Sequence, residues 1–306
     1  MVTRFGVVGT AHWARTVHVP GLIATPEVEL VGITGRNPDK VRAIAAEHGI
    51  RAFSDLEAML DCVDAVSLAV PPEAQPALAC MAAARGKHLL LEKPIALTLA
   101  GAQSILHATA GKVAGIVFFM RRFVPEIEQA IEQAAASRWQ HARVRVHSSA
   151  LSTATPYADS AWRQADGAVL WDIAPHILSV LVPVLGPVAR VSARREAGCI
   201  VALTTTHAHG AVAESSMTLH APADGKISAF TFEADGRSLT LPEPVIDQKA
   251  AYVRAAAELL ALIAAGTTRH RCDVGFGMAV FQVLDAAERS IATGATVVPH
   301  AFGALR

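Results

Sequence analysis

Short apolar runs alternate with longer helical segments over the first 120 residues of the chain. The runs of strand length are Phe5–Gly9, Val28–Thr34, Ala65–Val70, His88–Leu91 and Val113–Met120. Between them, apolar residues recur at helical spacing in the alanine-rich segments Pro38–His48, Ala74–Arg85 and Thr98–Thr109. Continuous apolar strands separated by helices predict a parallel sheet that is covered on both faces.

Residues at the ends of these helical segments support the prediction. Asn37, Pro38 and Asp39 offer an N-cap, a proline at the first helical position and an acid in the first turn. Gly49 and Gly86 stand where a helix would end in the left-handed conformation.

The pattern changes to alternation of apolar and polar residues after a helix expected near Glu126–Trp139. Strands of this kind are predicted in "ARVRVHSSA", "ARVSARRE", "IVALTTTHAHGAVAESSMTLHA" and "KISAFTFEADGRSLTL", with turns at Gly210 and Asp235-Gly236. Helices over Gln248–Ala265 and Gly275–Thr293 follow. The predicted fold class is α/β: a doubly wound Rossmann domain over residues 1–120, then an α+β domain over 121–306 with a large, mainly antiparallel open sheet.

Composition narrows the class of protein. The 306 residues are 52% hydrophobic, which indicates a globular chain, and 27 basic side chains balance 27 acidic ones. This neutral balance gives no electrostatic footprint for nucleic acid or an anionic membrane. Four dispersed cysteines, no signal peptide and no run approaching ~18 uncharged apolar residues lead us to expect a soluble, cytoplasmic protein.

The first strand enters a loop that carries part of a nucleotide-binding pattern. Where a dinucleotide-binding chain has G-x-G-x-x-G, this chain has Gly9-x-Ala11-x-x-Ala14. Gly9 suits the tight turn that brings backbone N–H groups to a phosphate at a helix N-terminus. Taken alone, the loop is equally typical of an ordinary strand-to-helix turn. As a cofactor loop, it would place Thr10, Ala11, His12 and Trp13 beside the nucleotide.

The end of the second strand bears on which nucleotide is bound. NAD-binding folds usually place an acid there, on the ribose hydroxyls, whereas this chain has Gly35 followed by Arg36. A guanidinium pairs well with a 2′-phosphate, so Arg36 favours NADP over NAD. The alternative is an arginine that only solvates the turn.

Two later segments carry candidate catalytic side chains. "KHLLLEKPIAL" ends an apolar strand in Glu92-Lys93-Pro94, at the sheet edge where open α/β sheets bind ligands; Pro94 fixes the turn and is compatible with a cis bond. In "WDIAPHILS", Asp172 and His176 are four residues apart and share a helix face. Histidine beside a hydride acceptor can take the proton of an alcohol, although Asp-x-x-x-His alone is more often a surface pair or a capped core histidine.

Together these segments resemble the glucose–fructose oxidoreductase/inositol dehydrogenase (Gfo/Idh/MocA) family. The resemblance is carried, in family order, by "GVVGTAHWA", "AVPPEAQ", "LLLEKPIAL", "FFMRRFVP", "GAVLWDIAPHILSVLVPVLG" and "AAERSIATGATVVP". It implies hydride transfer between NADP (or NAD) and a sugar- or polyol-like small molecule. His176 would be the general base or acid, Lys93 would stabilise the same oxygen, and Asp172 would bind a neighbouring hydroxyl or orient His176.

The resemblance also implies the surrounding site. Cofactor-binding candidates beyond the first loop and Arg36 are Val70, Pro71, Gln75, Glu92 and Lys93. Substrate-binding candidates beside Asp172 are Arg122, Tyr157, Trp162 and Arg163. The chain departs from the family pattern by its few loop glycines, by Gln75 where a histidine is common, and by Gly35 where an acid is common. A homodimer or homotetramer through the second sheet is the implied assembly.

Three rival interpretations remain at this level. A metal enzyme could use His207 with His209, or His270 with Cys272, but two ligands without a third make this the weaker interpretation, and we expect no metal site. A nucleotide-sensing protein without turnover would not need the lysine and histidine, which are both present. An enzyme of the same fold could instead reduce a non-sugar substrate.

Overall fold

The computed structural model describes residues 2–152, 155, 161–165 and 167–300. The chain forms two compact units: Met1–Phe123 with Ile246–Met278, and Val124–Val245 with Ala279–Arg306. The segment Ile246–Met278, which we assigned to the second domain, therefore groups with the first unit. Periodicity shows that this segment is helical, but it does not show which sheet the helix packs against.

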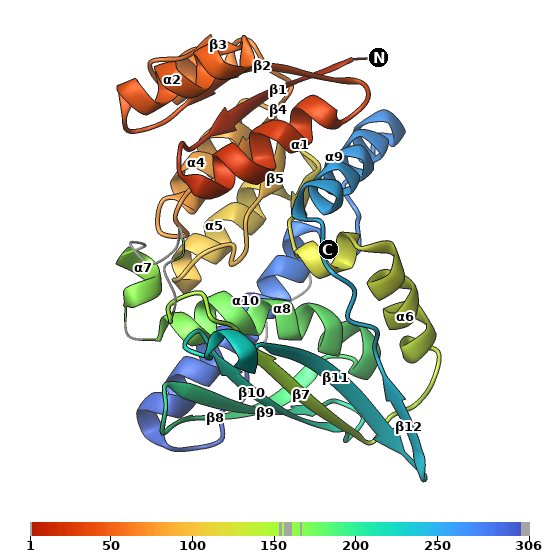
Figure 1. Ribbon diagram of the computed structural model, residues 1–306. Helices are drawn as coiled ribbons and strands as arrows, with labels where there is room; N and C mark the ends of the chain where they lie inside the picture. The colour runs from red at the N-terminus through yellow and green to blue at the C-terminus, as the bar shows by residue number, and fades with distance from the viewer. Residues whose placement is uncertain (1, 153–154, 156–160, 166, 301–306) are drawn as a thin grey trace. The chain divides into compact units, whose positions relative to one another are not determined.

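The sheet of the first unit is parallel throughout and has the strand order β3-β2-β1-β4-β5-β6 (Figure 1). This is the order of a doubly wound nucleotide-binding fold, and it confirms the predicted fold class. The strands are β1 (Thr3–Val8), β2 (Val28–Thr34), β3 (Arg51–Ala52), β4 (Ala65–Leu68), β5 (His88–Leu91) and β6 (Gly115–Val117).

Helices connect these strands, and their ends follow the predicted caps. The Asn37 side chain accepts a hydrogen bond from the Lys40 N–H at 3.0 Å, and Gly49 ends the same helix at a φ of 65°. The helical segments of this unit are η1 (Ala14–His18), α1 (Val19–Ala24), α2 (Pro38–His48), α3 (Leu56–Leu60), α4 (Gln75–Ala84), α5 (Leu99–Thr109), η2 (Met120–Phe123) and α9 (Gln248–Ala265). The short β3 and α3 were not predicted, because neither is long enough to show a period.

The sheet of the second unit has the order β12-β11-β7-β10-β9-β8. It is antiparallel, as predicted, except for the parallel pair β7–β10. Asp235 and Gly236 turn the β11–β12 hairpin with φ values of 49° and 75°, the positive angles that such a tight turn needs. The strands are β7 (His141–His147), β8 (Val188–Glu196), β9 (Ile200–His207), β10 (Val212–Thr218), β11 (Ile227–Ala234) and β12 (Arg237–Thr240).

One face of this second sheet is covered by a long apolar helix. The helices here are α6 (Pro125–Ala135), α7 (Ala161–Gln164), α8 (Ala168–Leu185), η3 (Ala223–Gly225) and the greater part of α10 (Val274–Thr293). By length and composition α8 could cross a membrane, which we did not expect from the sequence. However, 78% of it is buried inside the fold, where Trp171 packs on Phe281 at 5.7 Å between ring centroids. These are the properties of a core helix.

Candidate active site

The loop after β1 depends on its single glycine. Gly9 has a φ of 123°, and its N–H donates to the Thr34 carbonyl at 2.9 Å. A Cβ at this position would lie 2.1 Å from the carbonyl oxygen of Ala69. No other residue fits such a close approach of two neighbouring strand ends. Gly9 is therefore the turn residue that the sequence predicted.

A hollow of about 580 Å³ adjoins this loop. Thr10, Ala11 and His12, all predicted at the cofactor, lie on its wall. Two cations that sequence reasoning missed, Arg15 and Lys40, also line it. Lys40 could have been found from its place in the first turn of the helix after β2. The complete lining is Thr10, Ala11, His12, Arg15, Thr16, Lys40, Ala43, Ile44 and Glu47.

These features fit the phosphates of a dinucleotide. A helix begins at His12, and the first N–H groups of any helix have no acceptor within it. Arg15 and Lys40 add positive charge beside that helix start, although the Arg15 guanidinium lies 3.2 Å from the Glu47 carboxylate. Arg36 is exposed just past the end of β2, four residues before Lys40. The donor set is therefore right for an anionic cofactor.

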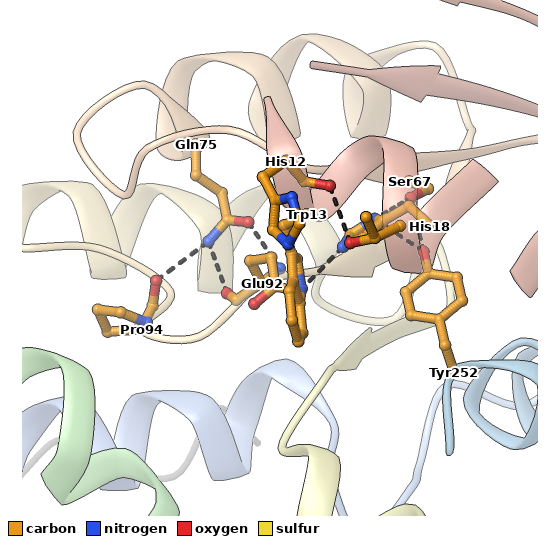
Figure 2. A network of polar contacts seen from close by, with 9 residues as sticks. His12, Trp13, His18, Ser67, Gln75, Glu92, Pro94 and Tyr252 are labelled. Carbon is orange, nitrogen blue, oxygen red and sulfur yellow. Dashed lines mark hydrogen bonds and ion pairs between the residues drawn. The ribbon is translucent and has the colours of Figure 1, made fainter. Parts of the chain in front are cut away.

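Two predicted cofactor residues, Trp13 and Glu92, bond to each other. The Trp13 indole donates to Glu92 Oε1 at 2.7 Å, and His18 Nε2 lies 3.0 Å from the same oxygen. On its other side, His18 meets Ser67 Oγ at 2.7 Å and the Tyr252 hydroxyl at 3.0 Å (Figure 2). His18, Ser67 and Tyr252 are completely buried, and no sequence motif indicated them.

The turn that presents Lys93 is held through its backbone. Lys93–Pro94 is a cis peptide bond, as the sequence allowed. Gln75 is fully buried; its Nε2 lies within 3.2 Å of the Glu92, Pro94 and Ile95 carbonyl oxygens, and its Oε1 accepts the Glu92 N–H at 2.8 Å. Figure 2 shows Gln75 reaching across this turn. Its contact with the cofactor stays a prediction, but its amide already has a structural role.

Three further predicted residues belong to the first unit: two lie past the end of β4 and one lies on η2. Val70 and Pro71 lie just past the end of β4, after Ala69. Arg122, predicted at the substrate, is buried, with its guanidinium 5.9 Å from the Phe276 ring centroid. Its backbone carbonyl accepts a hydrogen bond from Arg271 at 2.9 Å.

In the second unit, the structure joins Asp172 to Arg163. Asp172 is buried on α8, four residues before the half-buried His176. Arg163 Nε donates to Asp172 Oδ2 at 2.8 Å, and its guanidinium lies 4.4 Å from the Trp162 ring centroid. Three of the predicted substrate residues thus form one cluster. Tyr157, the fourth candidate of this unit, lies outside the described residues.

The fold and these clusters define a class: a nucleotide-binding Rossmann unit joined to an open-sheet unit, as in dinucleotide-dependent oxidoreductases. A family model described as "Oxidoreductase family, NAD-binding Rossmann fold" (GFO_IDH_MocA) matches residues 3–118. Over these residues the chain is similar to the Gfo/Idh/MocA family, the family that its motifs resemble. The match also confirms nicotinamide dinucleotide as the cofactor class of the family.

Two curated relatives are similar over about a third of the chain. The dTDP-3,4-didehydro-2,6-dideoxy-alpha-D-glucose 3-reductase of Streptomyces antibioticus is 36% identical over 105 residues, 34% of this chain and 32% of that protein. The scyllo-inositol 2-dehydrogenase (NADP(+)) IolU of Bacillus subtilis is 31% identical over 117 residues, 37% and 35% of the two chains. The matches therefore span only about a third of each relative's length.

Solved structures extend the likeness to the whole fold. The crystal structure of GenD2 from gentamicin A biosynthesis, in complex with NAD, superposes with a TM-score of 0.86. The alignment covers 98% of this chain and 97% of that one at 21% sequence identity. This similarity establishes that both units have the fold expected from the resemblance.

Proposed function

We propose that this protein is an NAD(P)-dependent oxidoreductase that transfers a hydride between a nicotinamide and a carbinol or carbonyl carbon of a sugar or polyol. The observation that carries the proposal is the family match over residues 3–118 in a chain that retains Lys93, Asp172 and His176. The relatives named above act, by their names, on a deoxysugar nucleotide and on an inositol. The alternative is an enzyme of the same fold that acts on a non-sugar substrate, and a substrate screen distinguishes the two.

The protein's own residues handle the proton and the charge. The bound nicotinamide supplies the carbon that accepts or donates the hydride. His176 takes the proton of the substrate hydroxyl in oxidation and returns it in reduction. Lys93 donates a hydrogen bond to the same oxygen and stabilises its negative charge. Because Asp172 already accepts a hydrogen bond from Arg163, we assign it to binding a neighbouring hydroxyl and to orientation.

The cofactor proposed is NADP in preference to NAD. Three cations, Arg36, Lys40 and Arg15, lie at the end of β2 or line the hollow beside the first loop. None of the residues from Gly35 to Pro38 is acidic, so no carboxylate there repels a 2′-phosphate. Lysine and arginine near the ribose end favour the additional phosphate.

The decisive experiment is a calorimetric titration with NADPH and NADH, followed by a sugar and polyol screen that monitors absorbance of the reduced nicotinamide. Binding of neither cofactor would refute the proposal. With an active substrate in hand, Lys93→Ala and His176→Ala should each lower turnover by about a hundredfold or more. The exposed residues Lys112 and His209 provide the matched controls Lys112→Ala and His209→Ala, which should retain full activity.

The proposed partner, besides the small-molecule substrate, is a second copy of this chain, and the proposed location is the cytoplasm. The face of the second sheet that α8 does not cover carries a shallow hollow of about 540 Å³ with both charge signs, including Arg143, Arg145, Glu214 and Glu233. Interspersed arginines and glutamates are self-complementary in a two-fold interface. Light scattering should give a dimer or tetramer that Arg145→Glu weakens; a monomer at all concentrations would refute the assembly.

A further inference from the structure

The helix that follows Gly9 contains one wide turn. Residues Ala14–His18 form a π-helical turn, in which the Val19 N–H bonds to the Ala14 carbonyl five residues earlier. Such turns are rare and occur frequently at functional sites. In an α-helix, residues five apart are rotated by about 140° beyond one full turn and face different directions. In a π turn, residues five apart lie almost above one another.

The wide turn therefore brings Trp13 and His18 to one side of the helix. Both meet the same atom, Glu92 Oε1, at 2.7 and 3.0 Å. Glu92 ends the strand β5 and immediately precedes Lys93. The two donors are separated from Glu92 by 79 and 74 residues of sequence. A single carboxylate oxygen thus ties the cofactor loop to the strand end that presents the lysine (Figure 2).

The contacts of this network lead from Glu92 to Tyr252. An indole N–H can only donate, so Trp13 donates to Glu92 Oε1. His18 Nε2 lies 3.0 Å from the same oxygen, and His18 Nδ1 lies 2.7 Å from Ser67 Oγ and 3.0 Å from the Tyr252 hydroxyl. Ser67 Oγ and the Tyr252 hydroxyl are 2.6 Å apart. Burial raises the pKa of Tyr252 far above its usual value, so its hydroxyl keeps its proton and remains a donor.

This network is closed at its inner end. Ser67 and Tyr252 are completely buried, while the Glu92 side chain is 14% exposed. The contacts of this network hold the Glu92 carboxylate in one place.

We propose that Trp13 and His18 are positioning residues whose bonds to Glu92 pre-organise the cofactor loop, which lacks the second and third glycines of the G-x-G-x-x-G pattern. The inference rests on the proposed function, because it concerns the binding of the nicotinamide cofactor. Ala11 and Ala14 leave the loop without the close backbone approach that glycine permits. The side-chain clamp of Trp13, His18 and Glu92 fixes the loop instead.

The clamp has a defined consequence for affinity. If it keeps nearly all molecules in the binding-competent loop conformation, its loss lowers the competent fraction, and the apparent Kd rises by the inverse of that fraction. A hydrogen bond to a charged group is strong enough to change such a population about tenfold. The effect concerns the loop, so NADPH and NADH should lose affinity by the same factor.

The test compares Trp13→Phe with Trp139→Phe. Trp139 donates its indole N–H to the Ala134 carbonyl at 2.8 Å in the second unit, so the control loses a bond of similar length elsewhere. Trp13→Phe should raise the Kd of both cofactors about tenfold and speed amide hydrogen exchange of residues 10–18 in the cofactor-free protein. Trp139→Phe should leave the Kd of both cofactors and the exchange of residues 10–18 unchanged.

Tyr252→Phe and Glu92→Gln test whether the network positions the cofactor loop or only packs the interior of the fold. Tyr252 is completely buried, whereas the Glu92 side chain is 14% exposed, so a merely structural network predicts a larger effect at Tyr252 than at Glu92. Positioning predicts the reverse order: Trp13→Phe and Glu92→Gln raise the Kd about tenfold, and Tyr252→Phe about twofold. In turnover assays, the cofactor KM should rise by more than kcat falls.

The outcomes distinguish this inference from the proposed function. A wild-type protein that binds neither cofactor refutes the proposed function and the inference with it. A wild-type protein that binds, with Trp13→Phe and Glu92→Gln equal to it in both Kd and hydrogen exchange, overturns the clamp alone. A larger change in Kd for Tyr252→Phe than for Trp13→Phe also overturns it.

Discussion

Arg163 Nε donates to Asp172 Oδ2 at 2.8 Å across nine residues, and both side chains are largely shielded from water. Removing one partner of a shielded pair takes a charged hydrogen-bond partner from the other, which costs several kcal/mol when the pair is fully buried. We therefore expect Arg163→Ala to lower the free energy of unfolding by about 2–3 kcal/mol. Urea denaturation measures the change.

The control for this prediction is Arg194→Ala in the same unit. Arg194 pairs with Glu196 at 2.5 Å, but its side chain is 69% exposed. Exposed pairs contribute at most about 1 kcal/mol, so this variant should unfold almost as the wild type does. Equal destabilisation by the two variants would show that Arg163 does not compensate the Asp172 charge. Arg163→Lys keeps the positive charge but loses the planar guanidinium, so its free energy of unfolding should lie between those of Arg163→Ala and Arg194→Ala.

Gly9 is predicted to tolerate no side chain. Its φ is 123°, and a Cβ added there would lie 2.1 Å from the Ala69 oxygen, so Gly9→Ala must separate the ends of β1 and β4. We expect a loss of about 3 kcal/mol or more and no measurable cofactor binding. Gly49→Ala is the matched control, because its φ of 65° is also positive while no atom lies within 4 Å of the added Cβ. That variant should lose only about 1–2 kcal/mol, from backbone strain alone.

Much of the fold could be predicted because its signals are local. The strands β2 and β5 and the helices α2 and α9 have the predicted bounds, since continuous apolar runs, caps and terminal glycines mark them. The hairpin turn was also predictable, because the Asp235-Gly236 pair favours the positive φ angles of a tight turn. The grouping of α9 with the first unit was not predictable, because it depends on contacts such as Tyr252 with Ser67, 185 residues away.

The candidate site likewise has residues that local sequence signals indicated and residues that they did not indicate. Gly9 and Lys93 were recognisable because strand ends place them, and Asp172 was recognisable from its spacing to His176. The π turn left no trace in the sequence, since an i to i+5 hydrogen bond follows from tertiary packing rather than from residue preference. His18 was therefore overlooked, and Trp13 and Glu92 were each assigned to the cofactor rather than to one another.

Cofactor preference should respond to charge at the end of β2. Arg36→Asp should weaken NADPH binding and improve NADH binding, changing the ratio of the two Kd values by about tenfold or more. Lys40→Glu should act in the same direction, because Lys40 lines the hollow beside Thr10 and His12. Both are measured by calorimetry with the two reduced cofactors.

Arg42→Asp is the control for these charge reversals. Arg42 lies on the same helix, α2, with its side chain 66% exposed and paired with Asp39. It is not among the residues that line the hollow in the described part of the chain. An unchanged ratio of Kd values in Arg36→Asp and Lys40→Glu, as in Arg42→Asp, would contradict the preference for NADP.

Stability of the first unit should fall at acid pH through Glu258. Burial raises the pKa of this carboxyl, but hydrogen bonds from His270, Arg271 and Arg254 outweigh burial and lower the pKa to about 2, from 4.5. A carboxyl with a depressed pKa stabilises the folded state above its unfolded pKa and loses that contribution as pH falls. The loss should therefore occur between about pH 4.5 and pH 2. After allowance for solvent screening, the contribution is about 1–2 kcal/mol.

Glu258→Gln tests this pH dependence, with the exposed Glu73→Gln as its control. At neutral pH, Glu258→Gln should lower the free energy of unfolding by about 1–2 kcal/mol, because the three donors lose a charged acceptor. Its unfolding free energy should also vary less steeply than that of the wild type between about pH 4.5 and pH 2. Urea denaturation across this range should find Glu73→Gln parallel to the wild type. A Glu258→Gln curve that is also parallel to the wild type would show that Glu258 does not contribute to the acid sensitivity.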